Sequence, residues 1–353
     1  MKFQFSKHKS ILITGGSGFI GSNLIEKLLK ETELIIYNLD KLGYASDNKQ
    51  IEKTLKKYNI KNSRYYLLNV DLFDLEKTKE ILSQVQPDLV IHLAAESHVD
   101  RSILNPNTFI ESNIVGTYNL LQSCFHVYSK YSLENKNKFR FLHVSTDEVF
   151  GSLGKNGLFC ENSKYDPRSP YSASKAASDH LVKAWFHTYK FPILVTNCGN
   201  NFGPWQFPEK LIPTIILNAL KNKKIPIYGN GSNIRDWIYV HDHINALLHI
   251  LSDGKIGDSY NIGSTEEKTN LEIAILICSI LDNKIPQKEK YCNLIDFVTD
   301  RPGHDQRYAI NASKLRDELG WAPKYEFNEA LKITVYWYLK NIEWCKNQYN
   351  SNF

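Results

Sequence analysis

The sequence lacks long hydrophobic runs, paired metal-binding motifs and blocks of like charge. No apolar run among its 353 residues approaches the roughly 20 residues that span a bilayer, so we expect no membrane association. Its six cysteines are widely spaced, and neither a Cys-x-x-Cys nor a His pair at metal-ligand spacing predicts a metal site. This cysteine usage is typical of reduced thiols, and we expect a cytoplasmic protein.

The charge is also weak and dispersed. The net charge is +5 and the lysines are scattered rather than gathered in a basic stripe, so we expect no nucleic-acid partner. A mildly basic chain also suits a small anionic substrate. With 42% hydrophobic and 23% charged residues, the composition is typical of a globular protein, and the length allows two lobes.

Short apolar runs alternate with longer amphipathic segments in the first two thirds of the chain. Uninterrupted Val, Ile and Leu runs between helices indicate parallel strands covered on both faces, which is a doubly wound α/β sheet of the Rossmann type. The predicted strands are 10–14, 34–39, 64–70, 88–93, 141–145 and 193–197, and the predicted helices are 21–30, 75–85, 107–128 and 171–189.

The alternation of apolar runs and amphipathic segments becomes irregular after residue 200, where several prolines lie in a loop-rich passage. We expect a sheet domain over 1–200, to which part of 236–262 returns. A smaller C-terminal lobe over 201–353, interleaved with the sheet domain, is expected to cover the ends of the strands. The elements predicted in this part are strands at 225–228 and 237–240 and helices at 271–281 and 328–340.

Three glycines follow the first predicted strand and open the first predicted helix. Gly15 allows a tight turn, Gly18 allows the backbone to approach a diphosphate, and Gly21 allows close helix–sheet packing. Asp40 ends the second strand about 20 residues on, as the dinucleotide fingerprint requires. Its carboxylate can bind a ribose hydroxyl and repels a 2′-phosphate, so the sequence favours NAD over NADP. A flexible turn is the alternative interpretation of the glycines alone.

Two further strand ends point to the same site. Asp71 follows the third predicted strand, and Leu93, Ala94 and Ala95 follow the fourth. Because the carboxyl ends of parallel strands meet at one edge, the cofactor is expected to lie beside them. The small alanines suit a backbone pressed against a ligand, although alanine is also ordinary in a core.

A tyrosine and a lysine four residues apart open the predicted helix at 171–189. Tyr171 and Lys175 share one helical face. A free phenol has a pKa of about 10, which a neighbouring ammonium and a cationic nicotinamide would lower, so Tyr171 is the candidate base and Lys175 its tuning group. Two other Tyr-x-x-x-Lys matches are attributed to composition: Tyr37/Lys41 in a strand and Tyr336/Lys340 in the last helix.

Thr146, Asp147 and Glu148 follow the predicted strand at 141–145. Hydride transfer needs one proton-transfer group, so an additional acid and base predict that a small molecule, water above all, is also eliminated. Neighbouring side chains on a strand face opposite ways, so both carboxyl groups can serve one substrate only if the chain turns there. A solvated turn or a helix cap is the alternative for an isolated carboxylate pair.

The sequence resembles the extended short-chain dehydrogenase/reductase superfamily and, within it, the dTDP-glucose 4,6-dehydratase family. The resemblance covers nearly the whole chain. It rests on TGGSGFIGS, LDKLGYA, HLAAESHVDRS, VSTDEVFG, PYSASKAASDHLV, NCGNNFGPWQFPEKLIP, GNGSNIRDWIYVHD, YNIG and DRPGHDQRYAI in this order. Gly43, Ser46, Gly199 and Phe202 depart from the residues usual in that family, and none of them is a proton-transfer group.

The resemblance implies an enzyme that dehydrates dTDP-D-glucose to dTDP-4-keto-6-deoxy-D-glucose, in deoxysugar biosynthesis of the dTDP-rhamnose type. Tyr171 takes the C4 hydroxyl proton, Glu148 removes the C5 proton and Asp147 protonates the departing C6 hydroxyl. Thr146 positions the sugar. Tightly bound NAD accepts the hydride from C4, returns it to C6 and is regenerated in each turnover.

The resemblance also implies an assembly and, with the strand ends, a set of binding residues. A homodimer would form a four-helix bundle through 107–128 and 171–189. The expected cofactor residues are Gly15, Gly18, Phe19, Ile20, Gly21, Asp40, Lys41, Leu42, Gly43, Asp71, Leu72, Leu93, Ala94, Ala95, Ser97, Ser112, Tyr171, Lys175 and Asn201. The expected substrate residues are Ser97, Thr146, Asn200, Lys210, Leu211, Pro226, Ile227, Tyr228, Arg235, Asn270, Asp300, Arg301, Pro302, Gly303 and His304.

Three alternatives remain open. A sugar-nucleotide 4-epimerase or decarboxylase would share the NAD site and the candidate base but would not need the two acids. A UDP-sugar 4,6-dehydratase would differ only in the nucleotide. A non-catalytic NAD-binding protein would keep the fold without the chemistry. His98, Asp100 and Arg101 receive no role from the sequence.

Overall fold

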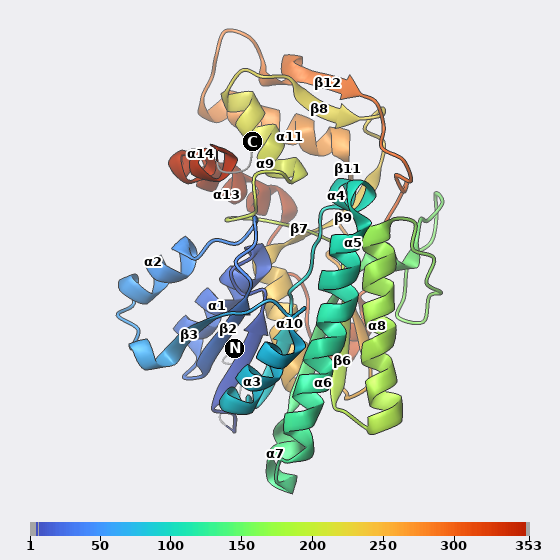
Figure 1. The fold of residues 1–353 in the computed structure, drawn as a ribbon. Helices are drawn as coiled ribbons and strands as arrows, with labels where there is room; N and C mark the ends of the chain where they lie inside the picture. The colour runs from blue at the N-terminus through green and yellow to red at the C-terminus, as the bar shows by residue number, and fades with distance from the viewer. Residues whose placement is uncertain (1–4, 6, 351–353) are drawn as a thin grey trace.

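The computed structural model describes residues 5 and 7–350, and a seven-stranded parallel sheet lies at its centre (Figure 1). The strands lie in the spatial order β3-β2-β1-β4-β5-β6-β10, and each neighbouring pair is parallel. This confirms the doubly wound α/β fold, whose order reverses between β1 and β4. The strands are β1 (Ser10–Thr14), β2 (Ile35–Asp40), β3 (Tyr65–Asn69), β4 (Leu89–His92), β5 (Arg140–Thr146), β6 (Ile193–Cys198) and β10 (Ser259–Ile262).

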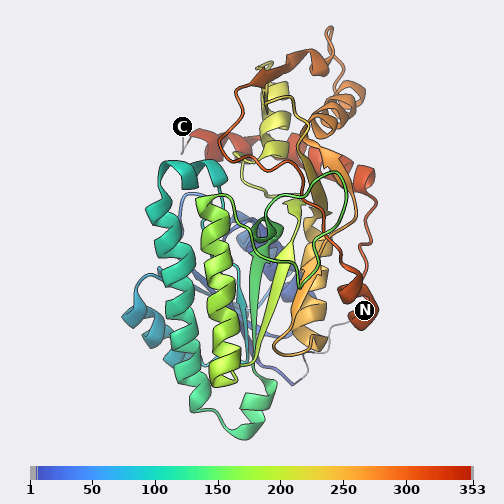
Figure 2. The same ribbon diagram turned by 90° about the vertical axis from the view of Figure 1, so that its right-hand side faces the viewer.

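Helices cover both faces of the sheet (Figures 1 and 2). The strand β1 sends Ile11 and Ile13 to one hydrophobic cluster and Leu12 to the other, because successive side chains of a strand face opposite ways. Apolar residues on both faces explain why the strands are uninterrupted Val, Ile and Leu runs. One face carries α3 (Leu75–Val85), α6 (Gly116–Ser129) and α8 (Pro170–Tyr189), and the other carries α1 (Phe19–Glu31) and α10 (Val240–Asp253).

The predicted helix at 107–128 is not one regular α-helix. The segment contains α5 (Pro106–Phe109), a π-helical turn η2 (Ile110–Val115) and then α6. The buried Asn113 lies in this wider turn: its Nδ2 donates to the carbonyl of Glu96 (3.0 Å) and to Ser174 Oγ (2.8 Å), and its Oδ1 accepts from the Glu96 amide (2.8 Å). Such π turns recur at functional sites, and Ser112 in this one lines the cavity described below.

Part of the chain after residue 200 forms a lobe above the sheet in Figure 1, whereas α10 and β10 return to the sheet. The loop predicted around Pro213 is wrong there, because this proline lies in the first turn of α9, where its missing amide is tolerated. The helix α9 is apolar around most of its surface, and a short apolar run of this kind does not distinguish a buried helix from a buried strand. The lobe contains β7 (Asn200–Phe202), β8 (Ile225–Tyr228), β9 (Ile234–Tyr239), β11 (Glu267–Thr269), β12 (Ile295–Val298), α9 (Leu211–Leu220), α11 (Asn270–Lys284), α13 (Phe327–Lys340) and α14 (Ile342–Asn350). The helix α12 (Ser313–Leu319) packs against α10 and β10 beside the sheet.

One hydrophobic cluster continues from the sheet into this lobe. It includes Ile13 of β1, Ile216 of α9 and Ile277 of α11. Among the described residues, no helix is long and apolar enough to cross a membrane. The remaining short elements are α2 (Lys49–Lys57), α4 (Val99–Leu104), α7 (Leu133–Lys138), η1 (Asn62–Arg64), η3 (Asp147–Phe150) and η4 (Tyr291–Leu294).

Candidate active site

Glycines shape the turn between β1 and α1. Gly15 has φ +70°, and a Cβ there would lie 2.7 Å from the backbone nitrogen of Ala94. A Cβ at Gly21 would lie 2.3 Å from the carbonyl oxygen of Gly15. Gly18 caps α1 without a side-chain hydrogen bond, so amides at the start of α1 can meet an anion. The turn therefore fits the diphosphate of a dinucleotide.

Asp40 links this turn to the loop that follows β2. Its buried carboxylate accepts hydrogen bonds from the Ser17 amide (2.9 Å), the Leu42 amide (2.8 Å) and the Ser46 hydroxyl (2.9 Å). A carboxylate is an acceptor only, so its remaining lone pairs fit ribose hydroxyl donors and not a phosphate.

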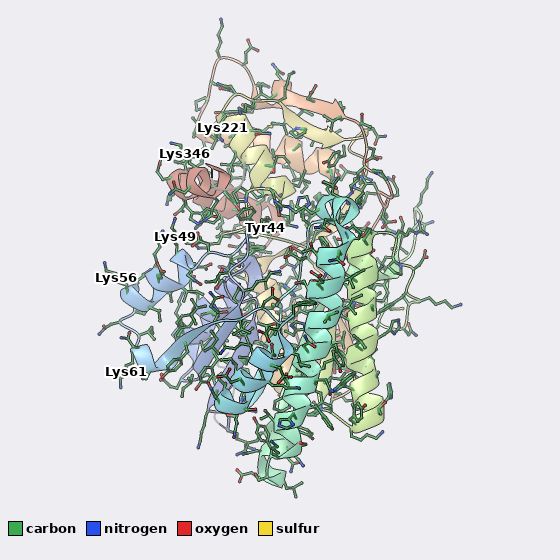
Figure 3. The ribbon with its side chains drawn as sticks, in the orientation of Figure 1. Tyr44, Lys49, Lys56, Lys61, Lys221 and Lys346 are labelled. Carbon is green, nitrogen blue, oxygen red and sulfur yellow. The ribbon has the colours of Figure 1, made fainter. Side chains whose placement is uncertain are left out.

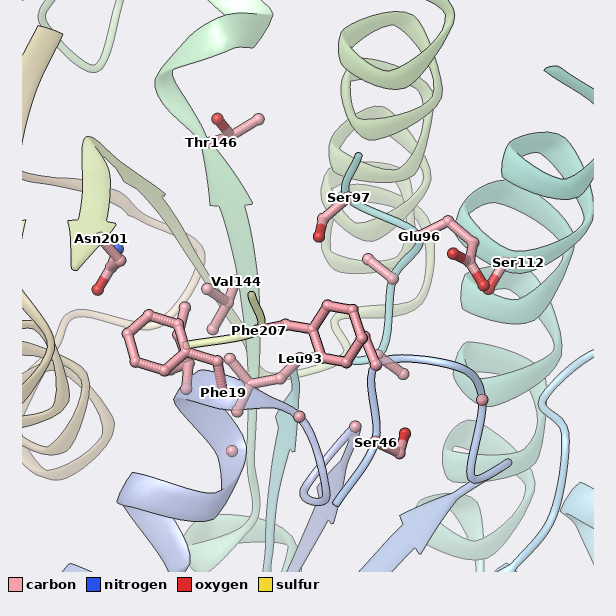
Figure 4. A pocket seen from close by; sticks show the side chains of 18 of the residues that line it. Phe19, Ser46, Leu93, Glu96, Ser97, Ser112, Val144, Thr146, Asn201 and Phe207 are labelled. Atoms are coloured by element: carbon pink, nitrogen blue, oxygen red, sulfur yellow. The ribbon is translucent and has the colours of Figure 1, made fainter. Parts of the chain in front are cut away.

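A cavity of about 350 Å³ opens at the carboxyl ends of the strands (Figure 4). Figure 4 shows Thr146 and Asn201 on one side of it and Glu96, Ser97 and Ser112 on the other. Leu42 is not part of its lining. The predicted residues that do line it are Gly15, Gly18, Phe19, Ile20, Gly21, Asp40, Lys41, Gly43, Asp71, Leu72, Leu93, Ala94, Ala95, Ser97, Ser112, Thr146, Asp147, Glu148, Tyr171, Lys175, Asn200, Asn201 and Lys210.

The chain turns directly after β5, as two acids at one cavity require. A 3₁₀ helix begins at Asp147, and Thr146 caps it by accepting a hydrogen bond from the Glu148 amide (3.2 Å). The Thr146 hydroxyl donates to Asp147 Oδ1 (3.3 Å). Because a 3₁₀ helix has three residues per turn rather than a strand's period of two, neighbouring side chains no longer face opposite ways. Both carboxyl groups therefore line the cavity.

The two acids differ in their surroundings. Burial, and next the negative charge of Glu148, raise the pKa of Asp147 well above its ordinary value. Asp147 Oδ2 is buried and has no hydrogen-bond partner among the described residues. Burial also raises the pKa of Glu148, although the charges of Arg301, Arg235 and Lys210 oppose it. A neutral Asp147 can donate a proton, and Glu148 faces the cations that favour its carboxylate form.

Tyr171 and Lys175 begin α8 beside these acids. The helix starts with a capping box at Ser169, which sets the first turn against β5. Lys175 Nζ donates to the carbonyl oxygen of Val144 (2.9 Å). Burial, and next the charge of Glu148, raise the pKa of Tyr171 well above its ordinary value. Lys175 by itself therefore does not give Tyr171 the lowered pKa that was predicted from the sequence.

Two arginines lie at the acid end of the site. Arg235 is 4% exposed, and its guanidinium donates to the carbonyls of Ile234 (2.7 Å) and Asp305 (3.0 Å). Arg301 Nη1 lies 3.4 Å from Asp100 Oδ1. The charges of both arginines act on Glu148. Cations of this kind fit a substrate phosphate.

Arg235 and Arg301 are not part of the cavity lining, and neither are the remaining predicted substrate residues. Ile227 is 1% exposed in β8, whereas Pro226 and Tyr228 face outward from the same strand. Leu211 begins α9 and packs against the core. The remaining members of this group are Asn270 at the start of α11 and Asp300, Pro302, Gly303 and His304 in the segment after β12.

Glu209 and Tyr44 also line the cavity, although no pattern in the sequence predicts them. The Tyr44 hydroxyl donates to Glu209 (2.8 Å), and Arg101 Nη2 (3.2 Å) and His98 Nε2 (3.8 Å) lie against the same carboxylate. Tyr44 lies between the sheet and the upper lobe (Figure 3). His98 and Arg101 therefore join the two parts of the molecule. No spacing rule could pair residues that lie more than a hundred positions apart.

Asp100 makes a second link between the sheet half and the lobe. It accepts a hydrogen bond from the Tyr228 hydroxyl (3.2 Å) and pairs with Arg301. No group of three or more His, Cys, Asp or Glu side chains that could hold a metal ion occurs among the described residues.

Comparison with known proteins agrees with this geometry. The family model for GDP-mannose 4,6 dehydratase matches residues 12–334. The dTDP-glucose 4,6-dehydratase of Salmonella typhimurium is 50% identical over 346 residues, which cover 96% of this chain and 94% of that protein. The crystal structure of the Bacillus anthracis dTDP-glucose 4,6-dehydratase in complex with NAD superposes with a TM-score of 0.83 at 40% identity and covers 96% of this chain and 99% of that one.

A second solved structure has a bound nucleotide as well. The dTDP-glucose 4,6-dehydratase of Streptomyces venezuelae, with NAD and TYD bound, has a TM-score of 0.85 at 36% identity, with 96% of this chain and 99% of that chain covered. The chain therefore belongs to the dTDP-glucose 4,6-dehydratase family of the extended short-chain dehydrogenase/reductase superfamily.

Proposed function

We propose that the protein dehydrates dTDP-D-glucose to dTDP-4-keto-6-deoxy-D-glucose, with a tightly bound NAD that is regenerated in each turnover. One observation carries this proposal: a phenol, an ammonium and two carboxyl groups line the cavity that the glycine-rich turn also lines. A simple dehydrogenase needs the phenol and the ammonium alone. The two carboxyl groups account for the loss of water.

Tyr171 is proposed to remove the proton from the C4 hydroxyl. Bound NAD supplies the hydride acceptor for C4 and the hydride donor for C6. Burial and the charge of Glu148 raise the pKa of Tyr171. The positive charge of the oxidised nicotinamide ring would lower that pKa and favour the phenolate beside Lys175. Proton removal is therefore coupled to the oxidised cofactor.

The two acids have different proposed roles in the elimination of water. The new C4 carbonyl acidifies the C5 proton, and Glu148, which faces three cations, is the proposed base. Asp147 has a raised pKa and an unpartnered Oδ2, so its protonated form is favoured and it is the proposed donor to the leaving C6 hydroxyl. Thr146 holds both acids in place through its hydroxyl and positions the sugar.

The nucleotide end of the substrate is proposed to extend from the acids toward the lobe. Lys210, Arg235 and Arg301 supply cations for the diphosphate. The exposed face of β8, with Pro226 and Tyr228, is proposed to border the nucleoside. Ser97 and Asn200 line the cavity between these groups and the cofactor turn.

Product mass tests the proposal. The purified protein is mixed with NAD and, separately, with dTDP-glucose, UDP-glucose or GDP-mannose, and the products are weighed by mass spectrometry. We expect the dTDP sugar to become lighter by one water. Conversion without a change of mass would indicate a 4-epimerase, preferential dehydration of UDP-glucose would indicate the UDP-sugar enzyme, and unchanged sugars would indicate a non-catalytic NAD-binding protein.

We further propose a homodimer through a four-helix bundle in the cytoplasm. The helices α6 and α8 run side by side along one flank of the molecule in both views (Figures 1 and 2). Ile110, Tyr118 and Tyr189 on this flank are 49%, 38% and 48% exposed. Light scattering should give twice the mass of one chain, and the mass of one chain would contradict the dimer. The six unpaired thiols suit a reducing compartment.

A further inference from the structure

A buried carboxylate, Asp179, lies one helical turn beyond Lys175. Tyr171, Lys175 and Asp179 are spaced by four residues on α8, so they share the face that packs against β5. Lys175 Nζ donates to the carbonyl oxygen of Val144 (2.9 Å), and Ser145 Oγ donates to Asp179 Oδ2 (2.9 Å). The two charged groups therefore lie against consecutive residues of one strand.

Hydrogen bonds hold Asp179 in its ionised form although it is fully buried. His143 Nε2 lies 3.0 Å from Oδ1, and Oδ2 accepts from the Tyr165 hydroxyl (2.8 Å) and from Asn197 Nδ2 (3.3 Å) as well as from Ser145. Burial raises the pKa of Asp179, but the hydrogen bond to His143, the charge of Lys175 and the hydrogen bond from Ser145 outweigh it, and the pKa lies below its ordinary value.

Lys175 needs such an anion, because burial lowers the pKa of its ammonium. Asp179 and Cys198 oppose this lowering. The Cys198 thiol has a pKa raised by burial to about 12, so it is neutral at physiological pH. Burial lowers the pKa of His143 to about 4 and that of His92 well below its ordinary value, so neither carries charge there. Among the described residues, Asp179 is therefore the carboxylate whose negative charge stabilises the Lys175 ammonium.

We propose that Asp179 is a positioning residue for the dehydration: it keeps the buried Lys175 ammonium charged, and that charge favours the Tyr171 phenolate. The inference rests on the proposed function. Four helical residues rise about 6 Å and eight rise about 12 Å, so the carboxylate stabilises the ammonium more than it destabilises the phenolate. On the cavity side, Asp147 and Glu148 act on Tyr171.

The substitution Asp179→Asn removes the charge and keeps the shape. The rate of cofactor reduction is measured when the NAD-loaded protein meets dTDP-glucose, from about pH 6 to about pH 10. Without the anion Lys175 loses its proton at lower pH, so its charge no longer favours the phenolate, and the phenolate accumulates only at higher pH. We expect the rate to fall about tenfold for each pH unit of displacement at neutral pH, and to recover in alkali.

Two variants separate charge from hydrogen bonding. Tyr165→Phe removes one hydrogen bond from the same oxygen and keeps the carboxylate, so we expect the wild-type pH profile. Asp179→Glu restores the charge and should restore most of that profile. If Asp179→Asn does not fold, Asp179→Ser supplies a second neutral side chain with the same expected displacement.

A second measurement does not depend on turnover. In protein labelled with ¹³C at the phenol carbon of tyrosine, with the Tyr171 signal assigned by Tyr171→Phe, the phenol should titrate at higher pH in Asp179→Asn than in the wild type. An unshifted profile with an equal loss of rate at every pH would mean a structural role only and would overturn the inference. Failure of the wild type to reduce its cofactor would instead overturn the proposed function.

Discussion

The sheet half and the C-terminal lobe place their functional side chains in different ways. In the sheet half, Gly15, Asp40 and Thr146 lie at or just beyond the ends of parallel strands, so strand pairing alone brings them to one edge. In the lobe, Arg235 lies in a strand of a separate small sheet and Arg301 in the segment after β12. The pairing of parallel strands therefore places the residues expected to bind the cofactor. The two arginines expected to bind the substrate are placed by packing between distant segments. Variants in each half should fail in different ways.

The largest effect is expected from Tyr171→Phe. The phenol is the proposed base for the first step, and loss of a general base costs about 10²–10⁴-fold in rate. No reduced cofactor should appear when dTDP-glucose is added, as followed by absorbance. Tyr165→Phe is the matched control, because Tyr165 contacts Asp179 rather than the cavity. Reduction at the wild-type rate would show that another group is the base.

Glu148→Gln should fail one step later. Oxidation at C4 does not need this carboxylate, but removal of the C5 proton does, so product formation should slow by about 10²–10⁴-fold. Reduced cofactor should then accumulate on the enzyme, in contrast to Tyr171→Phe. A block of both variants at the same step would contradict the division of roles between the phenol and the acid.

Asp40→Asn tests the sheet half alone. A hydrogen bond to a charged group contributes about 1.5–3 kcal/mol, so we expect NAD to bind about tenfold or more weakly. The KM for dTDP-glucose at saturating NAD should change little, because Asp40 lies at the far end of the cavity. Discrimination against NADP should also relax. Unchanged NAD affinity by calorimetry would remove the ribose role from this carboxylate.

Arg235→Lys is the counterpart in the lobe. A lysine keeps the charge but loses the planar fork that binds phosphate oxygens in pairs. We expect the KM for dTDP-glucose to rise about tenfold, in line with the loss of one charged hydrogen bond. NAD retention through gel filtration should remain that of the wild type. Loss of NAD from this variant would show that the two halves do not act separately.

The smallest effect is expected on stability from Asp147→Asn. The folded-state pKa of Asp147 is raised, so its contribution to stability is present at low pH and is lost as the pH rises through that value. Asparagine does not ionise, so the variant should melt higher than the wild type in alkaline buffer and close to it in acid. A gain of about 1 kcal/mol corresponds to about 2 °C in melting temperature. An equal difference at every pH would mean that Asp147 does not titrate as stated.

Particular elements show where prediction from sequence succeeds. The strand at 10–14 and the helix at 75–85 have the predicted bounds, because apolar periodicity is a local property. The glycine-rich turn and Asp40 were also predictable, because their spacing follows from one strand–helix–strand unit. The apolar helix α9 and the π turn at Ile110–Val115 were not, because the first is a short run that is apolar around most of its surface and the second contains a buried Asn113 whose partners lie far away in the sequence.

The sequence by itself determined the sheet, the dinucleotide turn and which residues can transfer protons, since each depends on residue type and on spacing within a few tens of positions. Only the tertiary structure decided that Asp147 and Glu148 turn toward one cavity, that Arg235 and Arg301 act on the second of these acids, and that Asp179 stands behind Lys175. These facts are distances and burial between segments far apart in the chain. Burial and the distance to other charges set the pKa of an acid, and neither can be obtained from the sequence alone.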